Sequence, residues 1–433
     1  MKPASVDVLG EARHASPLPE ARFPQPGPCG AVGEAVVPAL TAWPGGRMPD
    51  DLLLFERAGP RQQLYFEPSK TRAAIVTCGG LCPGLNNVIR SVTRELLLSY
   101  GVPSVLGIVG GYRGLDPSRG EPPVELTEDF VEDIHHDGGT VIQTSRGPVD
   151  LKVAVDFLRE RKIDILFTVG GDGTQRGAKA LWDEARAQGY ELSVVGIPKT
   201  IDNDVRHVER TFGYATAVME AVHVIRSAHT EARSVSNGVS VVKLMGRHAG
   251  FIAAGATVAS QEVNFCLVPE QPFALEGEGG FLAALERRLQ RKDHAVVVVA
   301  EGAGQEHLES SGGRDASGNL LLGDIGLFLR DAIDRYFKTR GVEAVVRYID
   351  PSYLIRGCPA NTEDALLCDR LGRLAVHAAM SGRTGMVISY LNGQFAHVPI
   401  DMISGGGRQL EPAGELWRAV LSATGQPPQF QKE

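Results

Sequence analysis

The sequence predicts an α/β protein in which helices cover both faces of parallel β-sheets. Short runs rich in β-branched residues recur along the chain, for example "AAIVTCGG" at 73–80 and "DILFTVGG" at 164–171. Helix-like stretches lie between such runs, for example "LKVAVDFLRERK" at 151–162. Strands that read as near-continuous apolar runs are typical of parallel sheets buried on both sides. With 433 residues, the chain can form two ordinary domains or one large two-lobed domain.

The remaining elements follow the same alternation. The first run is followed by a helix-like stretch at 85–101, and further strand-like runs stand at 104–111, 192–200, 238–246 and 294–302. Almost every run ends in glycine-rich or polar sequence. Because open α/β sheets bind ligands just beyond the carboxyl ends of their strands, we expect the functional residues where these runs stop.

The composition excludes several classes of protein. With a net charge of −8, the protein as a whole lacks the basic excess typical of nucleic-acid-binding proteins, and no apolar stretch approaches the ~18 residues of a membrane span. Residues 1 to about 50 are Pro-rich and predict a partly ordered extension without a signal peptide. The six cysteines are scattered, and no second Cys or His pair is present to complete a zinc site with Cys78 and Cys82. We therefore expect the protein to reside in the reducing cytoplasm.

Two glycine-rich loops are candidates for binding phosphate. In "CGGLCPGLNNVIR", at 78–90, glycines before a helix let backbone amides approach an anion, although a tight βα turn explains them equally well. In "TVGGDGTQRGA", at 168–178, Asp172 would repel a phosphate unless a cation lies between them. Asp172 therefore predicts a Mg²⁺ contact and Gly173 predicts space for a nucleotide phosphate, unless the pair is simply an Asp-Gly turn.

Two further loops carry groups suited to phosphoryl transfer. In "PKTIDND", at 198–204, Asp202 or Asp204 could accept a proton and Lys199 could neutralise a phosphoryl group, or the carboxylates could cap the next helix. In "KLMGRHAG", at 243–250, Arg247 offers a bidentate fork suited to phosphate. The run "RYIDPSYLIRG", at 347–357, holds two arginines that could clamp a sugar phosphate or lie on the surface.

Taken in order, these loops resemble the 6-phosphofructokinase family. The likeness runs from about residue 55 to the neighbourhood of Gly385. It is closest to the longer ATP-dependent branch of plants and protists, which also carries "AGPR", "CGGLCPGLN", "GGDGT" and "PKTIDND". Five loops in one order are far more specific than any one of them alone.

The resemblance implies a role for each matching residue. Asp202 would take the proton from the 1-hydroxyl of fructose 6-phosphate, with Lys199 and Thr200 in the same loop, and Arg247 would stabilise the transferring phosphoryl group. The residues implied for ATP are Gly80, Arg146, Gly147, Gly171, Asp172, Gly173 and Thr174, with Asp172 on Mg²⁺. The residues implied for the sugar phosphate are Thr200, Ile201, Asp202, Met245, Gly246, Arg247, Glu301, Arg347, Tyr353, Leu354, Ile355 and Arg356.

The resemblance also implies a fold of two Rossmann-like three-layer lobes with parallel-rich sheets, in a cytoplasmic homodimer or homotetramer that serves glycolysis. The expected division is an extension at 1–70, a nucleotide lobe at 71–212 with about 356–400, and a sugar lobe at 213–355 with about 401–433.

One position departs from the family. Short bacterial members carry an arginine, supplied across a subunit interface, where this chain has Gly238.

The phosphoryl donor depends on two residues. By the same resemblance, pyrophosphate users of the family typically have Asp at the position of Gly173, and Lys at the position where short ATP users have glycine. Gly173 together with Lys199 is therefore a mixed signature. Because an Asp would block the α-phosphate of a nucleotide, Gly173 predicts ATP, with pyrophosphate as the alternative. Other kinases with "GGDGT", such as the lipid and NAD kinases, lack the later loops. A silent regulatory subunit would have lost Asp202, Arg247 or Asp172.

Overall fold

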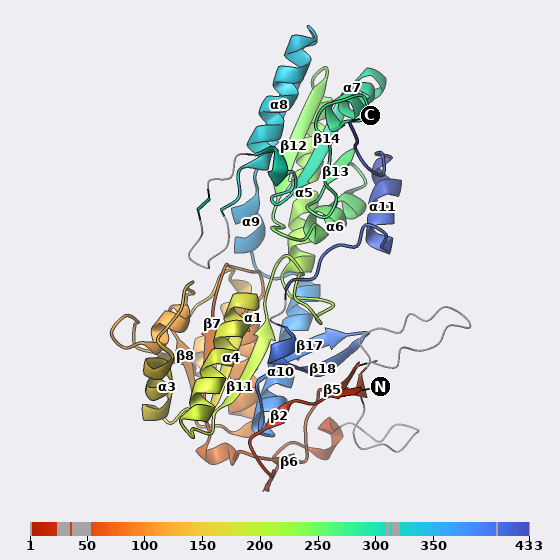
Figure 1. The fold of residues 1–433 in the computed structure, drawn as a ribbon. Helices are drawn as coiled ribbons and strands as arrows, with labels where there is room; N and C mark the ends of the chain where they lie inside the picture. The colour runs from red at the N-terminus through yellow and green to blue at the C-terminus, as the bar shows by residue number, and fades with distance from the viewer. Residues whose placement is uncertain are drawn as a thin grey trace, which may run out of the picture. The chain divides into compact units, whose positions relative to one another are not determined.

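The computed structural model describes residues 2–23, 35–36, 53–308, 312–313, 321–403 and 406–432. The chain divides into two compact units. Unit 1 comprises Met1–Ile201, Val205–Gly213 and Gly357–Gly406, and unit 2 comprises Asp202–Asp204, Tyr214–Arg356 and Gly407–Glu433. Each unit is an α/β structure with its own sheet (Figure 1). Among the described residues, no helix has the length and apolarity that crossing a bilayer requires.

Unit 1 is built on a large mixed sheet with a parallel centre. Its central strands are parallel neighbours in the order β17-β11-β10-β7-β8. Their bounds are Met386–Leu391, Ser193–Pro198, Ile165–Gly170, Arg72–Thr77 and Ser104–Ile108. Antiparallel strands flank this centre, with β9 (Val124–Glu125) on β8 and β18 (Gln394–Pro399) on β17.

Helices cover both faces of this sheet. Alternate side chains of one strand point to opposite faces, so Ile75 of β7 packs in one buried cluster and Ala74 in another. The first cluster includes residues of α1 (Leu85–Arg94) and α10 (Thr362–Met380). The second includes residues of α3 (Leu151–Glu160) and α4 (Asp172–Ala187). The short helix α2 spans Glu128–Val131, and a π-helical turn, Glu95–Tyr100, extends α1.

The described parts of the N-terminal extension join unit 1 through short strands. β1 (Lys2–Ala4) pairs with β5 (Leu53–Arg57), which pairs with β18 and so enters the large sheet. The other short strands are β2 (Asp7–Val8), β3 (His14–Ala15), β4 (Ala35–Val36), β6 (Gln63–Leu64) and β16 (Arg383–Thr384), which form the pairs β2–β16, β3–β6 and β4–β5. Buried side chains also hold these segments, since Leu64 packs in the first cluster and Val36 and Phe55 pack in the second.

Unit 2 is built on a four-stranded parallel sheet in the order β13-β14-β12-β15 (Figure 1). Its strands are Phe265–Leu267, His294–Ala300, Gly238–Leu244 and Val345–Ile349. Val239 and Val241 of β12 pack in one buried cluster with residues of α7 (Phe281–Lys292) and α8 (Ile325–Thr339). The remaining helices of unit 2 are α5 (Tyr214–Arg233), α6 (Phe251–Ser260), α9 (Ser352–Gly357) and α11 (Glu415–Thr424).

The predicted fold class is confirmed. The six β-branched runs form β7, β8, β10, β11, β12 and β14, each ending within three residues of the expected end. The stretch at 85–101 forms α1 and its π-helical turn, and the stretch at 151–162 forms α3. All six strands lie in parallel pairs.

Candidate functional site

The phosphate-loop candidates of unit 1 meet at one edge of its sheet. β7, β10 and β11 are parallel neighbours, and Gly170 at the end of β10 is in register with Pro198 at the end of β11. The loops that follow these strands therefore leave the sheet side by side. They begin at Cys78, Gly171 and Lys199. The structure thus brings three of the predicted loops together, as strand order requires.

The first loop is held by Lys199. Its ammonium donates to the carbonyl oxygen of Gly80 at 2.7 Å, although the whole residue is only 6% exposed. A side chain at Gly79 would place its Cβ 3.2 Å from this ammonium, at a backbone φ of +88° that glycine adopts without strain. The hydroxyl of Thr144 donates to the carbonyl of Gly79 at 2.8 Å. Lys199, which left the donor open on sequence grounds, therefore supports the glycine loop.

Arg146 and Gly147 belong to the same group. A Cβ built on Gly80 would lie 3.4 Å from Nη2 of Arg146, so this guanidinium runs close beside the first loop. Gly147 has a φ of +105°, where a side chain would be strained. The neighbouring Ser145 accepts a hydrogen bond from the amide of Gly79 at 3.0 Å through its carbonyl oxygen. The Arg146 guanidinium and the glycine loop therefore lie together at one edge of the sheet.

The "GGDGT" loop forms the start of α4, a helix of 16 residues. Gly171 is the N-cap, and Asp172 is the first helical residue. The helix dipole and the exposed amides of a first turn both favour an anion. A Cβ on Gly170 would come within 2.1 Å of the Thr174 hydroxyl, so this glycine is required for packing. By contrast, a Cβ on the exposed Gly173 would have no neighbour closer than Arg176 Nη2 at 3.8 Å.

The "PKTIDND" run crosses from unit 1 to unit 2. In unit 1, the carbonyl oxygen of Thr200 accepts from the Thr211 hydroxyl at 2.6 Å, and Ile201 packs against the buried cluster of α1 and α10. In unit 2, the amide of Arg408 donates to the carbonyl of Asp204 at 2.6 Å. The backbone on each side of Asp202 is therefore anchored.

The candidates of unit 2 lie at the carboxyl ends of β12 and β14. Leu244 and Ala300 are paired in register, and the amide of Glu301 donates to the carbonyl of Leu244 at 2.9 Å. A Cβ on Gly302 would lie 1.9 Å from the carbonyl oxygen of Arg247. Glycine there lets the loop of Met245 and Arg247 run against the loop after Glu301. A Cβ on Gly246, at a φ of +131°, would lie 2.5 Å from the carbonyl oxygen of Ala249.

Glu301 is the electrostatic centre of this group. Its burial raises the pKa of the carboxyl group above the usual value, and the charges of Arg247, Lys243 and Arg356 oppose that rise. Asp350 adds to it. Three cations from β12, the following loop and α9 are thus near one carboxylate. Such a set suits a ligand that offers both hydroxyl groups and a phosphate.

The two arginines of the predicted clamp have different surroundings. Arg356 stacks over the Tyr353 ring at 4.6 Å and contributes to the electrostatics of Glu301. Arg347, in β15, pairs with Glu231 of α5 at 2.8 Å, and both side chains are about half exposed. Among the described contacts, Arg347 is therefore held on α5 and not against Tyr353 or Arg356. Its part in a clamp stays a prediction.

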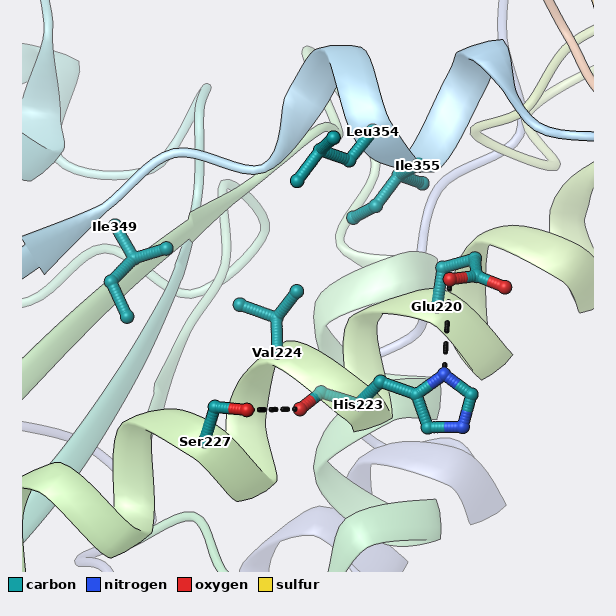
Figure 2. A pocket seen from close by; sticks show the side chains of 7 residues that line it. All are labelled: Glu220, His223, Val224, Ser227, Ile349, Leu354 and Ile355. Atoms are coloured by element: carbon teal, nitrogen blue, oxygen red, sulfur yellow. Dashed lines mark hydrogen bonds and ion pairs between the residues drawn. The ribbon is translucent and has the colours of Figure 1, made fainter.

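An apolar pocket of about 290 Å³ lies beside the clamp segment, between α5, the end of β15 and α9. Figure 2 shows Ile349, Leu354 and Ile355 opposite Val224, with the ring of His223 near the Glu220 carboxylate at 3.8 Å. Tyr353 and Leu354 are 78% and 74% exposed, which is unusual for large apolar side chains next to one another. This face is referred to below as the α5–α9 face.

Lys243 and Asp350 are site neighbours that the sequence did not single out. A signal was present, because Lys243 is the one charged residue in the apolar run "GVSVVKLMG". Among the described residues, no cluster of three or more His, Cys, Asp or Glu side chains could hold a metal ion. A metal at Asp172 would therefore need oxygen ligands from a bound phosphate or from water.

Comparison with known proteins gives one consistent family. The family model "Phosphofructokinase" matches residues 72–379. An "ATP-dependent 6-phosphofructokinase" of Borreliella burgdorferi is 48% identical over 385 residues, 87% of this chain and 86% of that protein. "ATP-dependent 6-phosphofructokinase 7" of Arabidopsis thaliana is 48% identical over 86% of this chain and 77% of its own length. The protist Trypanosoma brucei brucei has an "ATP-dependent 6-phosphofructokinase" that is also 48% identical, over 86% of this chain and 76% of that protein.

A solved structure supports the fold. The pyrophosphate-dependent phosphofructokinase of Marinobacter aquaeolei superposes with a TM-score of 0.68, covering 83% of this chain and 93% of that one. The two sequences are only 19% identical. This likeness concerns the architecture and does not bear on the donor.

Proposed function

Because this chain belongs to the phosphofructokinase family, we propose that it transfers the γ-phosphoryl group of ATP to the 1-hydroxyl of fructose 6-phosphate. The product is fructose 1,6-bisphosphate, and the activity is that of an ATP-dependent 6-phosphofructokinase of glycolysis. The resemblance found in the loops and the 48% identity to relatives named for this reaction both support the assignment.

One observation carries the choice of donor. The space beside Gly173 is open, since a Cβ there would have no neighbour within 3.8 Å. Gly173 lies in the first turn of α4, where amides and helix dipole attract phosphate oxygens. We propose that the nucleotide side comprises this turn, the loop of Gly80, and Arg146. Lys199 donates to the carbonyl of Gly80 and so supports that loop.

Asp172 fits a magnesium ion carried by the nucleotide. It is the acid of the α4 first turn, and a single carboxylate suits Mg²⁺, which keeps waters and substrate phosphates as its other ligands. When bound, the ion would neutralise phosphate charge. The protein's own residues then do the rest, because phosphoryl transfer needs alignment, charge stabilisation and one proton acceptor.

The proposed proton acceptor is Asp202. The backbone on both sides of it is anchored, by Thr211 in unit 1 and by Arg408 in unit 2, which suits a base that must meet a hydroxyl group in a fixed geometry. Arg247 supplies the fork for the transferring phosphoryl group. Glu301 accepts hydrogen bonds from sugar hydroxyls, and Arg356 with Tyr353 holds the 6-phosphate.

Pyrophosphate is the alternative donor, and it has less support. Besides Lys199, structural neighbours named as pyrophosphate-dependent phosphofructokinases are only 18–19% identical to this chain and report on the fold alone. We also propose a homodimer or homotetramer in the cytoplasm. The half-exposed Arg347 and the apolar α5–α9 face suit a site completed by a second chain. Unit 1 would serve the nucleotide and unit 2 the sugar phosphate.

The test is to identify the product. Purified protein with fructose 6-phosphate, ATP and Mg²⁺ should form ADP and fructose 1,6-bisphosphate in equal amounts, detected by aldolase-coupled NADH oxidation and by phosphorus NMR. A phosphate on any other hydroxyl, or ADP formed without sugar phosphorylation, would overturn the proposal. The Asp202→Asn variant is the matched control for background kinases.

A further inference from the structure

A partly buried lysine links three elements of unit 2. Lys243 lies one residue before the end of β12, and its side chain is 13% exposed. Its ammonium is 2.9 Å from Oδ2 of Asp324 and 3.0 Å from Oδ2 of Asp350. The two carboxylates come from different segments, since Asp324 precedes α8 and Asp350 precedes α9.

Each carboxylate uses its other oxygen to begin a helix. Oδ1 of Asp324 accepts from the amides of Gly326 and Leu327 at 3.0 and 3.1 Å, and so caps α8. Oδ1 of Asp350 accepts from the amide and the hydroxyl of Ser352, the first residue of α9, at 3.1 and 2.5 Å. Lys243 therefore fixes the starts of two helices to the end of one strand.

The same ammonium lies near the substrate candidates. Its charge lowers the pKa of Glu301, which opposes the rise that burial causes. In addition, β12 continues directly into Met245, Gly246 and Arg247. Burial alone would lower the pKa of Lys243, but hydrogen bonds with Tyr348, Asp324 and Asp350 raise it above the usual value. The lysine therefore stays charged at neutral pH.

A purely stabilising ion pair is the simpler explanation, but it does not explain the location. α9 carries Tyr353 and Arg356, is only 6 residues long, and has one buried side chain, Ile355. So short a helix is not stable by itself, and its position depends on what holds its ends. Asp350, which forms an ion pair with Lys243, holds the first turn of α9 in place.

We propose that Lys243 is a positioning residue for the sugar-phosphate side of the site. It holds the start of α9, and through it Arg356, at a fixed place relative to Glu301 and to the loop of Arg247. It does so through Asp350, without touching the substrate itself. The inference rests on the proposed function, because Arg356 and Glu301 are sugar-phosphate ligands only if that function holds.

The principal test is Lys243→Met, which keeps the length of the side chain and removes the charge. We expect the KM for fructose 6-phosphate to rise about tenfold or more, the size of effect that loss of a part-buried charge pair gives, with the KM for ATP within about twofold. Lys243→Arg, which can still span both carboxylates, should restore most of the affinity. Lys338→Met, at an exposed position of α8, is the matched control and should behave as the wild type.

Two readouts separate positioning from simple destabilisation. In Lys243→Met the pKa of Glu301 rises further, so the acid limb of kcat/KM for fructose 6-phosphate should move to higher pH than in Lys338→Met. Asp350→Asn keeps an oxygen to cap α9 but loses the charge pair, so it should raise the same KM even where Lys243→Met folds poorly. Equal changes in the KM for ATP and for fructose 6-phosphate, or no change in either, would overturn the inference.

Hydrogen exchange decides the inference without any turnover. The amides of residues 352–357 should exchange faster in Lys243→Met than in the wild type, and at the wild-type rate in Lys338→Met. If α9 exchanges equally in all three proteins, Lys243 does not hold it and the inference is wrong. A wild type that phosphorylates no fructose 6-phosphate would instead contradict the proposed function and leave the exchange result to stand alone.

Discussion

Replacing Gly173 by aspartate isolates the feature on which the choice of donor depends. The substitution adds a carboxylate at the second residue of α4. The structure accepts it, because the new Cβ would meet only Arg176 Nη2, at 3.8 Å, and Gly173 is not among the glycines with positive φ. An acid in a helix first turn should even stabilise the fold by about 0.3–1 kcal/mol. Any loss of activity would therefore not be due to misfolding.

The size of the effect follows from electrostatics. A carboxylate about 5 Å from a phosphate oxygen costs about 3 kcal/mol at an effective dielectric constant near 20. Because Gly173 is exposed, solvent and salt reduce this cost to about half, which still corresponds to about a tenfold loss in kcat/KM for ATP. The loss should shrink as salt is added, since screening weakens the repulsion.

The assay is steady-state kinetics with ATP as the varied substrate, alongside thermal unfolding. Gly173→Asn supplies the bulk without the charge, so it should lose less activity than Gly173→Asp at low salt. An aspartate variant with the wild-type kcat/KM for ATP would refute the proposal that phosphate lies beside Gly173. An asparagine variant as impaired as the aspartate variant would show that bulk, not charge, matters.

Three further predictions follow from individual residues. Asp202→Ser should lower kcat by about 10²–10⁴, as loss of a general base does, with little change in the KM for fructose 6-phosphate; a rise in KM alone would rule out the base. Gly302→Ala must displace the carbonyl of Arg247 and should cost about 1–3 kcal/mol in unfolding free energy, whereas Gly173→Ala should cost almost nothing; equal denaturation midpoints would contradict the close packing. Burial raises the pKa of Glu56 but hydrogen bonds from Arg383 and His397 outweigh it and hold the pKa well below its usual value. The ionised Glu56 therefore contributes fully to the unfolding free energy above the unfolded-state pKa of about 4.5, and this contribution is lost as pH falls. The unfolding free energies of wild type and Glu56→Gln should therefore differ less in acid than at pH 7. A difference that stays constant from pH 7 to pH 3 would argue against this pH linkage.

The strands and the ends at which function gathers were predictable from the sequence. Runs such as "DILFTVGG" are apolar throughout because both faces of their strand are buried, and polar residues can begin only where the strand leaves the sheet. The loops of Gly80 and Asp172 could therefore be placed at the carboxyl ends of strands before the order of those strands was known.

Contacts that depend on strand order were not predictable. The bond from Lys199 to Gly80 joins residues 119 positions apart and exists because β7, β10 and β11 are neighbours. The partner of Arg347 in this chain, Glu231 of α5, could not be read from the sequence either. The short strands of the N-terminal extension were missed because two or three residues carry no period.

The central claim is tested most directly by measuring both donors on one preparation. Fructose 1,6-bisphosphate formation should be followed with ATP and Mg²⁺, and in parallel with pyrophosphate and Mg²⁺, at saturating fructose 6-phosphate. The account predicts that kcat/KM for ATP exceeds that for pyrophosphate by about 10² or more, the scale set by the loss of a phosphate-binding interaction. Turnover with pyrophosphate and none with ATP would contradict it.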